Sequence, residues 1–211
     1  MSIFANMNFS SKILEEAVLA MSSLPSIGKK TALRLVLHLA GNQTDKTKKI
    51  IKALTDLESQ LRMCESCFNY SDAPICNICS DAARNKYQIC IVASAKDVMA
   101  IENTQQFSGV YHVLGGVISP LEGVGPEHLQ IASLVQRVKN NEVEELIMAV
   151  SPSIEGDTTI YYISKLLSDT QVKISTIARG VAFGGELEYA DELTLGRSIH
   201  GRTDYNKEAI I

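Results

Sequence analysis

Four cysteines are the residues with the clearest potential for chemistry, and they follow the spacing Cys64-x2-Cys67-x8-Cys76-x2-Cys79. Two Cys-x-x-Cys pairs can place four thiolates around one tetrahedral Zn²⁺ ion, because the short spacing lets both sulfur atoms of a pair share the ion. No histidine falls within this span, so we expect a Cys₄ site. Four thiolates leave no position open for water, and we therefore predict one structural zinc ion per chain.

The remaining cysteine and the start of the chain agree with this interpretation. The first residues lack a basic segment followed by an apolar one, so no signal peptide is expected, and disulfides are the weaker explanation of the cysteines. Cys90 lies in an apolar run and is expected in a buried strand. Phe68 and Tyr70 are expected to cover the metal, with stacking against nucleic acid as the alternative.

A second candidate site is basic and precedes the cysteines. Apolar periodicity predicts helices over residues 11–24, 29–40 and 45–63, and a short turn with Pro25 and Gly28 separates the first two. We expect Gly28 to take a positive φ. Free N–H groups at the start of the second helix could face a phosphate, aided by the helix dipole. Side-chain charge at the same turn comes from Lys29, Lys30 and Arg34.

This turn resembles the helix-hairpin-helix motif, whose core reads Leu-Pro-Gly-Ile-Gly. The chain has Leu-Pro-Ser-Ile-Gly, so Ser26 stands where the first glycine is expected, while Ala32 and Leu35 match the positions downstream. Contacts of this kind read no bases, and binding should therefore be independent of sequence and sensitive to salt. An ordinary helical hairpin with solvated lysines, or an oligomer contact, is the alternative.

The third candidate is the loop at residues 151–157, which resembles the Asp-Pro-Asp-Arg-Glu-Gly-Glu loop of Toprim domains. In Toprim enzymes the two aspartates of the loop and a glutamate after the first strand gather Mg²⁺. Here those positions hold Ser151, Ser153 and Ala93. Only Glu155 and Asp157, and beyond the loop Asp97, remain as nearby carboxylates, so we expect a Toprim-like fold without its metal site. The alternative role of Glu155 and Asp157 is to complement a helix dipole.

The elements that position this loop form an α/β pattern. Strands are predicted over residues 88–92, 110–114, 146–150 and 172–177, and they alternate with helices over 95–103, 127–140 and 156–167. This alternation indicates an open, mainly parallel sheet. Ligand sites in such sheets lie beyond the carboxyl ends of the strands, which here means residues 93–94, 115–116 and 151–157.

Beyond the sheet, residues 183–211 form a tail whose apolar residues predict a strand or an arm that packs on a neighbouring subunit. The Gly184-Gly185 pair is not a P-loop, because the sequence Gly-x4-Gly-Lys-[Ser/Thr] is missing, so nucleotide hydrolysis has little support.

Composition adds a division of charge. The 211 residues carry a net charge of −4, which would argue against nucleic acid. However, residues 1–63 carry +4, residues 64–86 carry −1, and residues 87–211 carry −7. A basic N-terminal part and an acidic C-terminal part predict two modules with different partners. No run is apolar and long enough to span a bilayer.

The whole order resembles the RecR family of bacterial recombination mediators. It comprises a helix-hairpin-helix region (1–63), a Cys₄ zinc knuckle (64–79), a Toprim-like domain (87–182) and a C-terminal oligomerisation tail (183–211). Specific matches include residues 118–126, Ile-Ser-Pro-Leu-Glu-Gly-Val-Gly-Pro, and residues 184–188, Gly-Gly-Glu-Leu-Glu. Arg179 and Ala182 depart from the family's usual His and Pro.

The resemblance implies a cytoplasmic, nucleoid-associated factor of DNA repair that is not an enzyme. Such proteins form ring-like tetramers and act with RecO and RecF to help RecA replace single-strand-binding protein on gapped DNA. Carried onto this chain, the DNA contacts are Lys30 and Arg34, with Lys29 adjacent. The acidic Toprim surface around Glu155 and Asp157 would dock a protein such as RecO. The alternative is a metal-dependent Toprim enzyme that acts on nucleic acid.

Overall fold

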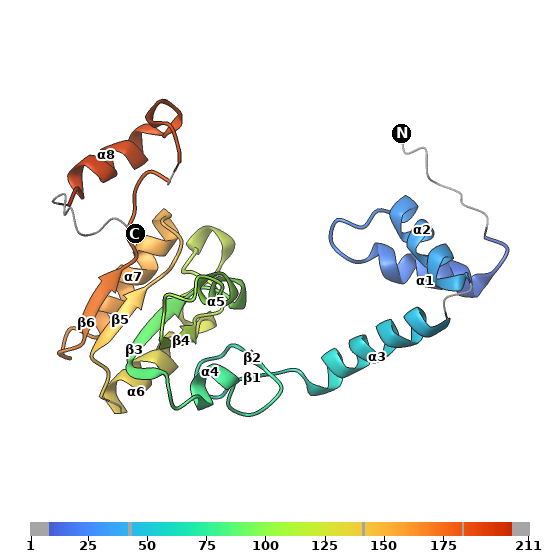
Figure 1. The fold of residues 1–211 in the computed structure, drawn as a ribbon, viewed down its shortest axis with the longest axis horizontal. Helices are drawn as coiled ribbons and strands as arrows, with labels where there is room; N and C mark the ends of the chain where they lie inside the picture. Colours follow the sequence, from blue (N-terminus) through green and yellow to red (C-terminus); the bar gives the residue numbers. More distant parts are fainter. Residues whose placement is uncertain (1–8, 42–43, 141, 183, 204–211) are drawn as a thin grey trace. The chain divides into compact units, whose positions relative to one another are not determined.

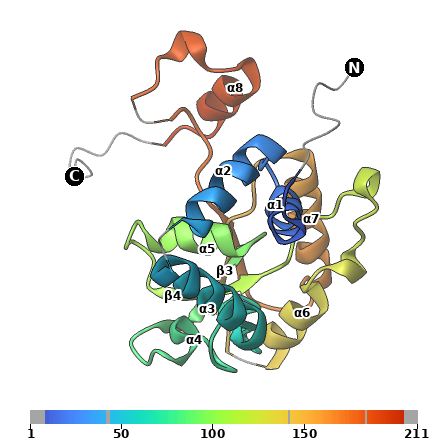
Figure 2. The ribbon, with the colours of Figure 1, turned by 90° about the vertical axis from the view of Figure 1, so that its right-hand side faces the viewer.

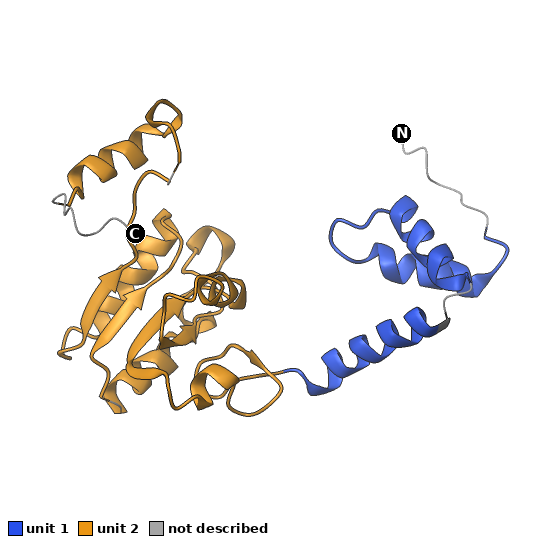
Figure 3. Cartoon of the chain, in the orientation of Figure 1, with its two compact units in different colours: residues 1–61 blue, residues 62–211 orange. Residues whose placement is uncertain are grey.

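The computed structural model describes residues 9–41, 44–140, 142–182 and 184–203 (Figure 1). The chain divides into two units, residues 1–61 and residues 62–211 (Figure 3). The first unit is helical, whereas the second holds both sheets, so the boundary falls just before the first predicted zinc ligand, Cys64.

Three helices make up the described part of the first unit: α1 (Lys12–Ser22), α2 (Lys29–Ala40) and α3 (Thr44–Gln60). Ser11 caps α1, because its Oγ accepts a hydrogen bond from the Leu14 N–H at 3.4 Å. A small core of Val18, Ala32 and Val36 joins α1 to α2. Helix α3 ends before the predicted Met63, because Arg62–Met63 form strand β1.

The turn between α1 and α2 differs from the prediction in its backbone. Gly28 has φ −77° and ψ 159°, an extended conformation, and the expected positive φ at this residue is wrong. The left-handed residue of the turn is Ser26, at φ +63°. The position where the motif carries its first glycine therefore needs the conformation that glycine adopts most easily, and serine adopts it here at a steric cost.

The second unit begins with the cysteine segment. Strand β1 pairs antiparallel with β2 (Tyr70–Ser71), and the four-residue helix α4 (Asn77–Ser80) follows. This hairpin and short helix enclose the first three cysteines, which are buried.

The main sheet has four parallel strands in the order β4-β3-β5-β6. The strands are β3 (Asn85–Val92), β4 (Gly109–Val113), β5 (Glu145–Met148) and β6 (Lys173–Thr176). Helices α6 (Ile131–Asn140) and α7 (Ile154–Leu166) cover one face, and α5 (Ala95–Glu102) covers the other (Figures 1 and 2). The predicted fold class, an open parallel α/β sheet, is confirmed.

Strand β3 divides its side chains between these two faces. Ile89 and Ile91 pack into the core beneath α6 and α7, whereas Cys90 and Val92 pack with Val98 of α5. This alternation is the period of two that a strand covered on both faces requires. The predicted burial of Cys90 in a strand is confirmed, at 3% exposure.

One predicted helix begins later than expected. The prediction began it at Glu127, but residues Pro126–His128 form a separate 3₁₀ turn and α6 starts at Ile131. Leu129 between them is extended, at φ −111° and ψ 156°. The Gln130 N–H donates to the Leu114 carbonyl at 2.9 Å, which ties this segment to the end of β4 and prevents a continuous helix.

The tail also differs from the prediction of a strand. Its described part contains a 3₁₀ turn at Leu187–Tyr189 and helix α8 (Glu192–His200). Asp191 caps α8 through its carboxylate, which accepts from the Thr194 N–H at 2.8 Å. Residues 204–211 of the predicted tail lie outside the described residues.

Candidate metal centre and nucleic-acid interface

The four cysteines predicted to bind zinc converge on one point. The Sγ atoms of Cys64, Cys67, Cys76 and Cys79 all lie within 4.8 Å of one another. The Sγ atoms of Cys67 and Cys76 are 3.6 Å apart. A tetrahedral ion with Zn–S bonds of about 2.3 Å separates its sulfur atoms by about 3.8 Å, so this donor set fits a tetrahedral thiolate site.

Backbone hydrogen bonds shape the first Cys-x-x-Cys pair. The Phe68 N–H donates to the Cys64 carbonyl at 2.9 Å, and the Cys64 N–H donates to the Asn69 carbonyl at 2.8 Å. Phe68 takes a left-handed conformation, at φ +61°, which reverses the chain after Cys67. The Cys76 N–H then donates to the Cys64 sulfur at 3.3 Å, which ties the second pair of cysteines to the first.

The thiol groups also influence one another's ionisation. A hydrogen bond with Cys67 is the main cause that lowers the pKa of Cys79 to about 5, and the charge of Arg137 lowers it further. The same hydrogen bond raises the pKa of Cys67. The cluster therefore provides a thiolate near neutral pH, which is the form that binds metal.

The two aromatic residues beside the cysteines have different surroundings. Tyr70 is 54% exposed. Phe68 packs on the core of the main sheet, and its ring meets the His112 ring edge-on with the centroids 5.3 Å apart. Phe68 therefore joins the cysteine segment to the Toprim-like domain, and the expectation that both rings cover the metal stays a prediction.

The predicted basic site lies at the start of α2. Lys29, Lys30 and Arg34 are all exposed, and among the residues that the structure describes none of them forms an ion pair. Lys30 and Arg34 line a shallow hollow of about 320 Å³. Gly28 precedes the helix without a side-chain cap, so the first N–H groups of α2 remain available to an anion.

The predicted Toprim loops share the carboxyl edge of the parallel sheet, as expected. Ser153 caps α7, and its Oγ accepts from the Gly156 N–H at 3.1 Å. Asp97 accepts from the N–H and the hydroxyl of Ser94, at 2.8 and 2.9 Å, in a capping box. Ser153 and Asp97 thus serve in helix capping.

Asp157 of the same edge is engaged by two arginines. It pairs with Arg179 at 2.6 Å and with Arg197 of α8 at 3.6 Å. The hydrogen bond from Arg179 lowers the pKa of Asp157. Within the described ranges, the cysteine cluster is the one group of three or more metal-ligating side chains whose donor atoms lie close together.

Sequence reasoning missed the most deeply placed cation of this region. Arg137 of α6 donates through Nη1 to the Ser66 carbonyl at 3.1 Å and to the Tyr111 carbonyl at 2.7 Å. One signal was present in the sequence, since Arg137 lies on the apolar face of α6 beside Leu134 and Val138, where a charged residue needs a buried partner.

Comparisons with known proteins agree with this arrangement. The Toprim domain family matches residues 87–178, and three RecR families match the rest: the helix-hairpin-helix (14–57), the Cys₄ zinc finger domain (61–81) and the C-terminal region (180–203). A protein of Flavobacterium johnsoniae is 54% identical over 95% of this chain and 98% of its own length. A protein of Cytophaga hutchinsonii is 54% identical over 93% of this chain and 97% of its own length. Both are named "Recombination protein RecR".

The helix-hairpin-helix, the cysteine cluster and the Toprim-like sheet, in this order, define a recombination protein that binds DNA and carries a zinc-binding site. The chain belongs to the RecR family. The predicted family and order of modules are confirmed, and a role in DNA repair and recombination follows from the family. Among the described helices, none has the length and apolar character needed to cross a membrane.

Proposed function

We propose that this protein is a recombination mediator that does not catalyse a reaction, and that it acts with RecO and RecF to load RecA onto gapped DNA coated with single-strand-binding protein. The observation that carries the proposal is the cluster of Lys29, Lys30 and Arg34 at the uncapped start of α2. These cations have no acidic partner among the described residues, so their charge is available to phosphate.

Binding through this surface is independent of DNA sequence. The cations and the N–H groups of α2 recognise phosphate oxygens, which every sequence offers. Ser26 keeps the turn in the left-handed conformation that the motif requires, although it is not glycine. The backbone part of the anion site is therefore retained.

The cysteine cluster holds one structural Zn²⁺ ion per chain through Cys64, Cys67, Cys76 and Cys79. The distances among the Sγ atoms and the burial of three of the four residues support this assignment. When bound, the ion links segments that otherwise share little core, because this hairpin has only two-residue strands.

The protein acts as an oligomer, a tetrameric ring that surrounds DNA. The apolar side chains of α3 support this proposal, because Ile50, Ile51, Leu54 and Leu57 are exposed, as is Leu61 directly after the helix. Exposed apolar faces of this kind mark contacts between proteins. Helix α8 adds Leu193 and Ile199, which are 65% and 61% exposed.

We assign residues 1–63 to DNA binding and oligomerisation, and residues 183–211 to oligomerisation. Residues 64–79 form the zinc knuckle, and residues 87–182 form the Toprim-like domain.

The Toprim-like domain serves as a docking surface for a protein partner such as RecO. Its acidic residues at the carboxyl edge include Glu155 and Asp157, of which Asp157 is already paired with Arg179. Glu155 is therefore the more available of the two carboxylates. Serines occupy the positions of the Toprim aspartates, so this edge offers too few oxygen ligands for catalysis by Mg²⁺. We place the protein in the cytoplasm, at the nucleoid.

A reconstituted loading assay tests the proposal. Gapped DNA is coated with single-strand-binding protein, and RecA filament formation is followed with RecO and RecF present, with and without this protein. We expect loading to require the wild-type chain and to fail with Lys30→Glu/Arg34→Glu, while Lys165→Glu on α7 of the second unit supports normal loading. Loading that ignores the double variant would contradict the assignment. Mg²⁺-dependent cleavage of DNA by the pure protein would replace it with an enzymatic function.

A further inference from the structure

Strand β4 lies at one end of the main sheet, and the cysteine segment covers its outer edge. Successive residues of a strand direct their backbone groups to opposite edges, so Tyr111 and Val113 share the edge that faces away from β3. The Val113 N–H donates to the carbonyl of Cys67 at 2.8 Å. An uncovered edge strand is prone to pair with other chains, so this cover has a physical purpose.

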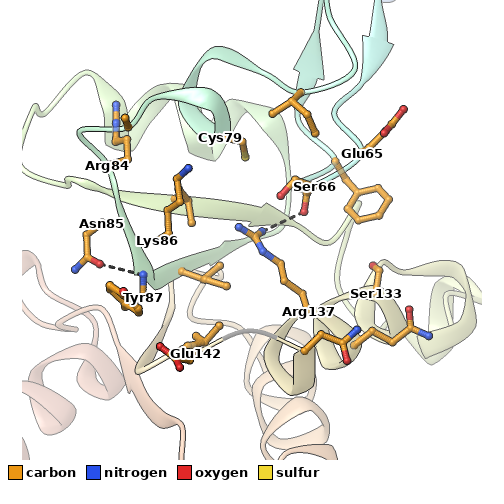
Figure 4. A pocket seen from close by; sticks show the side chains of 18 residues that line it. Glu65, Ser66, Cys79, Arg84, Asn85, Lys86, Tyr87, Ser133, Arg137 and Glu142 are labelled. Carbon is orange, nitrogen blue, oxygen red and sulfur yellow. Dashed lines mark hydrogen bonds between the residues drawn. The ribbon is translucent and has the colours of Figure 1, made fainter.

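Arg137 of α6 completes the cover from the other side. Its Nη1 bridges the Tyr111 carbonyl on the strand edge and the Ser66 carbonyl between the first two cysteines. Figure 4 shows the guanidinium pointing to Ser66, within the pocket of about 1020 Å³ that Cys79 also lines. One side chain therefore holds the cysteine segment and the sheet edge together.

The charge of Arg137 matches that of the proposed metal centre. Zn²⁺ with four thiolates carries a net charge of −2, which is costly in a partly buried site without a cation nearby. Burial lowers the pKa of Arg137, while the four cysteines raise it, Cys79 and Cys67 most strongly. A partly buried arginine beside thiolates is stabilised by them and stabilises them in return.

An apolar seam runs beside these polar contacts. Ile78, next to Cys79, packs both on the cysteine cluster and on the sheet core, and Phe68 contacts that core and the His112 ring. The seam does not discriminate between a charged and a neutral cysteine cluster, because apolar contacts are insensitive to charge. The contact that responds to the metal is therefore that of Arg137.

We propose that Arg137 is a positioning residue that neutralises part of the metal–thiolate charge and clamps the zinc knuckle onto the edge of β4, so that metal binding and closure of this edge are coupled. The proposal rests on the zinc site proposed above. Metals in proteins depend strongly on such outer partners, whose loss typically weakens metal binding about 10- to 100-fold.

The rate of zinc release to a metallochromic chelator tests the clamp. Arg137→Met keeps a long apolar side chain and removes the charged guanidinium group with its N–H donors. We expect zinc release to accelerate at least about tenfold. Arg137→Lys keeps the charge, and we expect it to recover at least half of that loss on a logarithmic scale. Lys139 lies on the same helix, and its ammonium group pairs with Asp169 at 3.0 Å. The variant Lys139→Met should release zinc at the wild-type rate.

Two outcomes would overturn the proposal: release from Arg137→Met at the wild-type rate, or equal release from the Lys and Met variants. Cobalt substitution provides the control for folding, because tetrahedral Co²⁺–thiolate bands in Arg137→Met show an intact ligand set. A wild-type protein without bound zinc would instead refute the metal site itself, so the two failures are distinguishable.

Hydrogen exchange on the wild type makes the test independent of any variant. Removal of zinc by a chelator should speed exchange of the Val113 amide at least about tenfold, while the amides of the inner strand β5 stay protected. An exchange rate of the Val113 amide that is the same with and without zinc would show that the strand edge and the metal are not coupled, and would refute the proposal.

Discussion

Removing the three exposed cations of α2 gives the sharpest test of how this protein holds DNA. Lys29, Lys30 and Arg34 lie within two turns of one helix start and have no competing acidic partner among the described residues. The perturbation is the triple substitution Lys29→Ala, Lys30→Ala, Arg34→Ala. Because Val18, Ala32 and Val36 form the core between α1 and α2, exposed side chains can be truncated without loss of packing.

The magnitude follows from counterion release. Each cation that meets one phosphate of duplex DNA contributes about 0.9 to the slope of log K against log salt, so three contribute about 2.7 per bound protomer. Between about 50 and 200 mM salt, wild-type binding should therefore weaken about 40-fold more than binding of the variant. If the plots of log K against log salt for the wild type and the variant meet at 1 M salt, the variant binds about 500-fold more weakly at 0.1 M salt.

Fluorescence anisotropy of a labelled gapped duplex over this salt range measures both slopes. Two unrelated DNA sequences should give the same slope, because phosphate contacts carry no sequence information. The matched control is Lys139→Ala, an exposed cation of the second unit, which should leave the slope unchanged. A triple variant with the wild-type slope would refute the placement of the phosphate contacts on α2.

Three further predictions concern stability and metal content. Cys64→Ser should abolish stoichiometric zinc, measured by atomic absorption, and unfold residues 62–80 in proteolysis, because structural zinc contributes on the order of 10 kcal/mol to such modules. Gly156→Ala should lower the free energy of denaturant unfolding by about 1–3 kcal/mol, since an added Cβ would lie 2.0 Å from the Ser151 carbonyl oxygen, whereas Gly28→Ala meets no atom within 4 Å and should cost less. Burial lowers the pKa of His112 to about 4, below its ordinary value near 6.5, so the unfolded chain takes up a proton first as the pH falls. Wild-type stability should therefore decline between about pH 6.5 and 4 by up to about 3 kcal/mol relative to His112→Gln, and parallel pH profiles of the two proteins would contradict this reasoning.

The features that sequence alone determined are local ones. The spacing of the cysteines places two sulfur atoms on each tight turn, whatever the rest of the fold. The apolar periodicity over residues 11–24 and 29–40 identified the first two helices, and the alternation of apolar runs with helical periods identified the parallel sheet. In each case the signal and the structure that it predicts lie within a few residues of each other.

Local signals also misled where a distant contact was stronger. Pro126 and Glu127 look like a helix start, yet the Gln130 N–H is bound to the Leu114 carbonyl at the end of β4 and the helix begins after it. Gly28 is the conspicuous residue of the basic turn, but the left-handed φ falls on Ser26, because the position in the turn decides the backbone and not the residue that adopts it most easily.

Only the tertiary structure decided which groups meet across the chain. Arg137 and Ser66 are 71 positions apart, and Asp157 pairs with Arg179 and with Arg197 of the tail. No periodicity or spacing encodes such pairs, since they depend on how helices and strands pack. The sequence by itself determined the modules and the clustering of the four cysteines, because these follow from backbone geometry over a few residues. The fold decided how the zinc knuckle is joined to the sheet, because that junction is made by residues that are neighbours only in space.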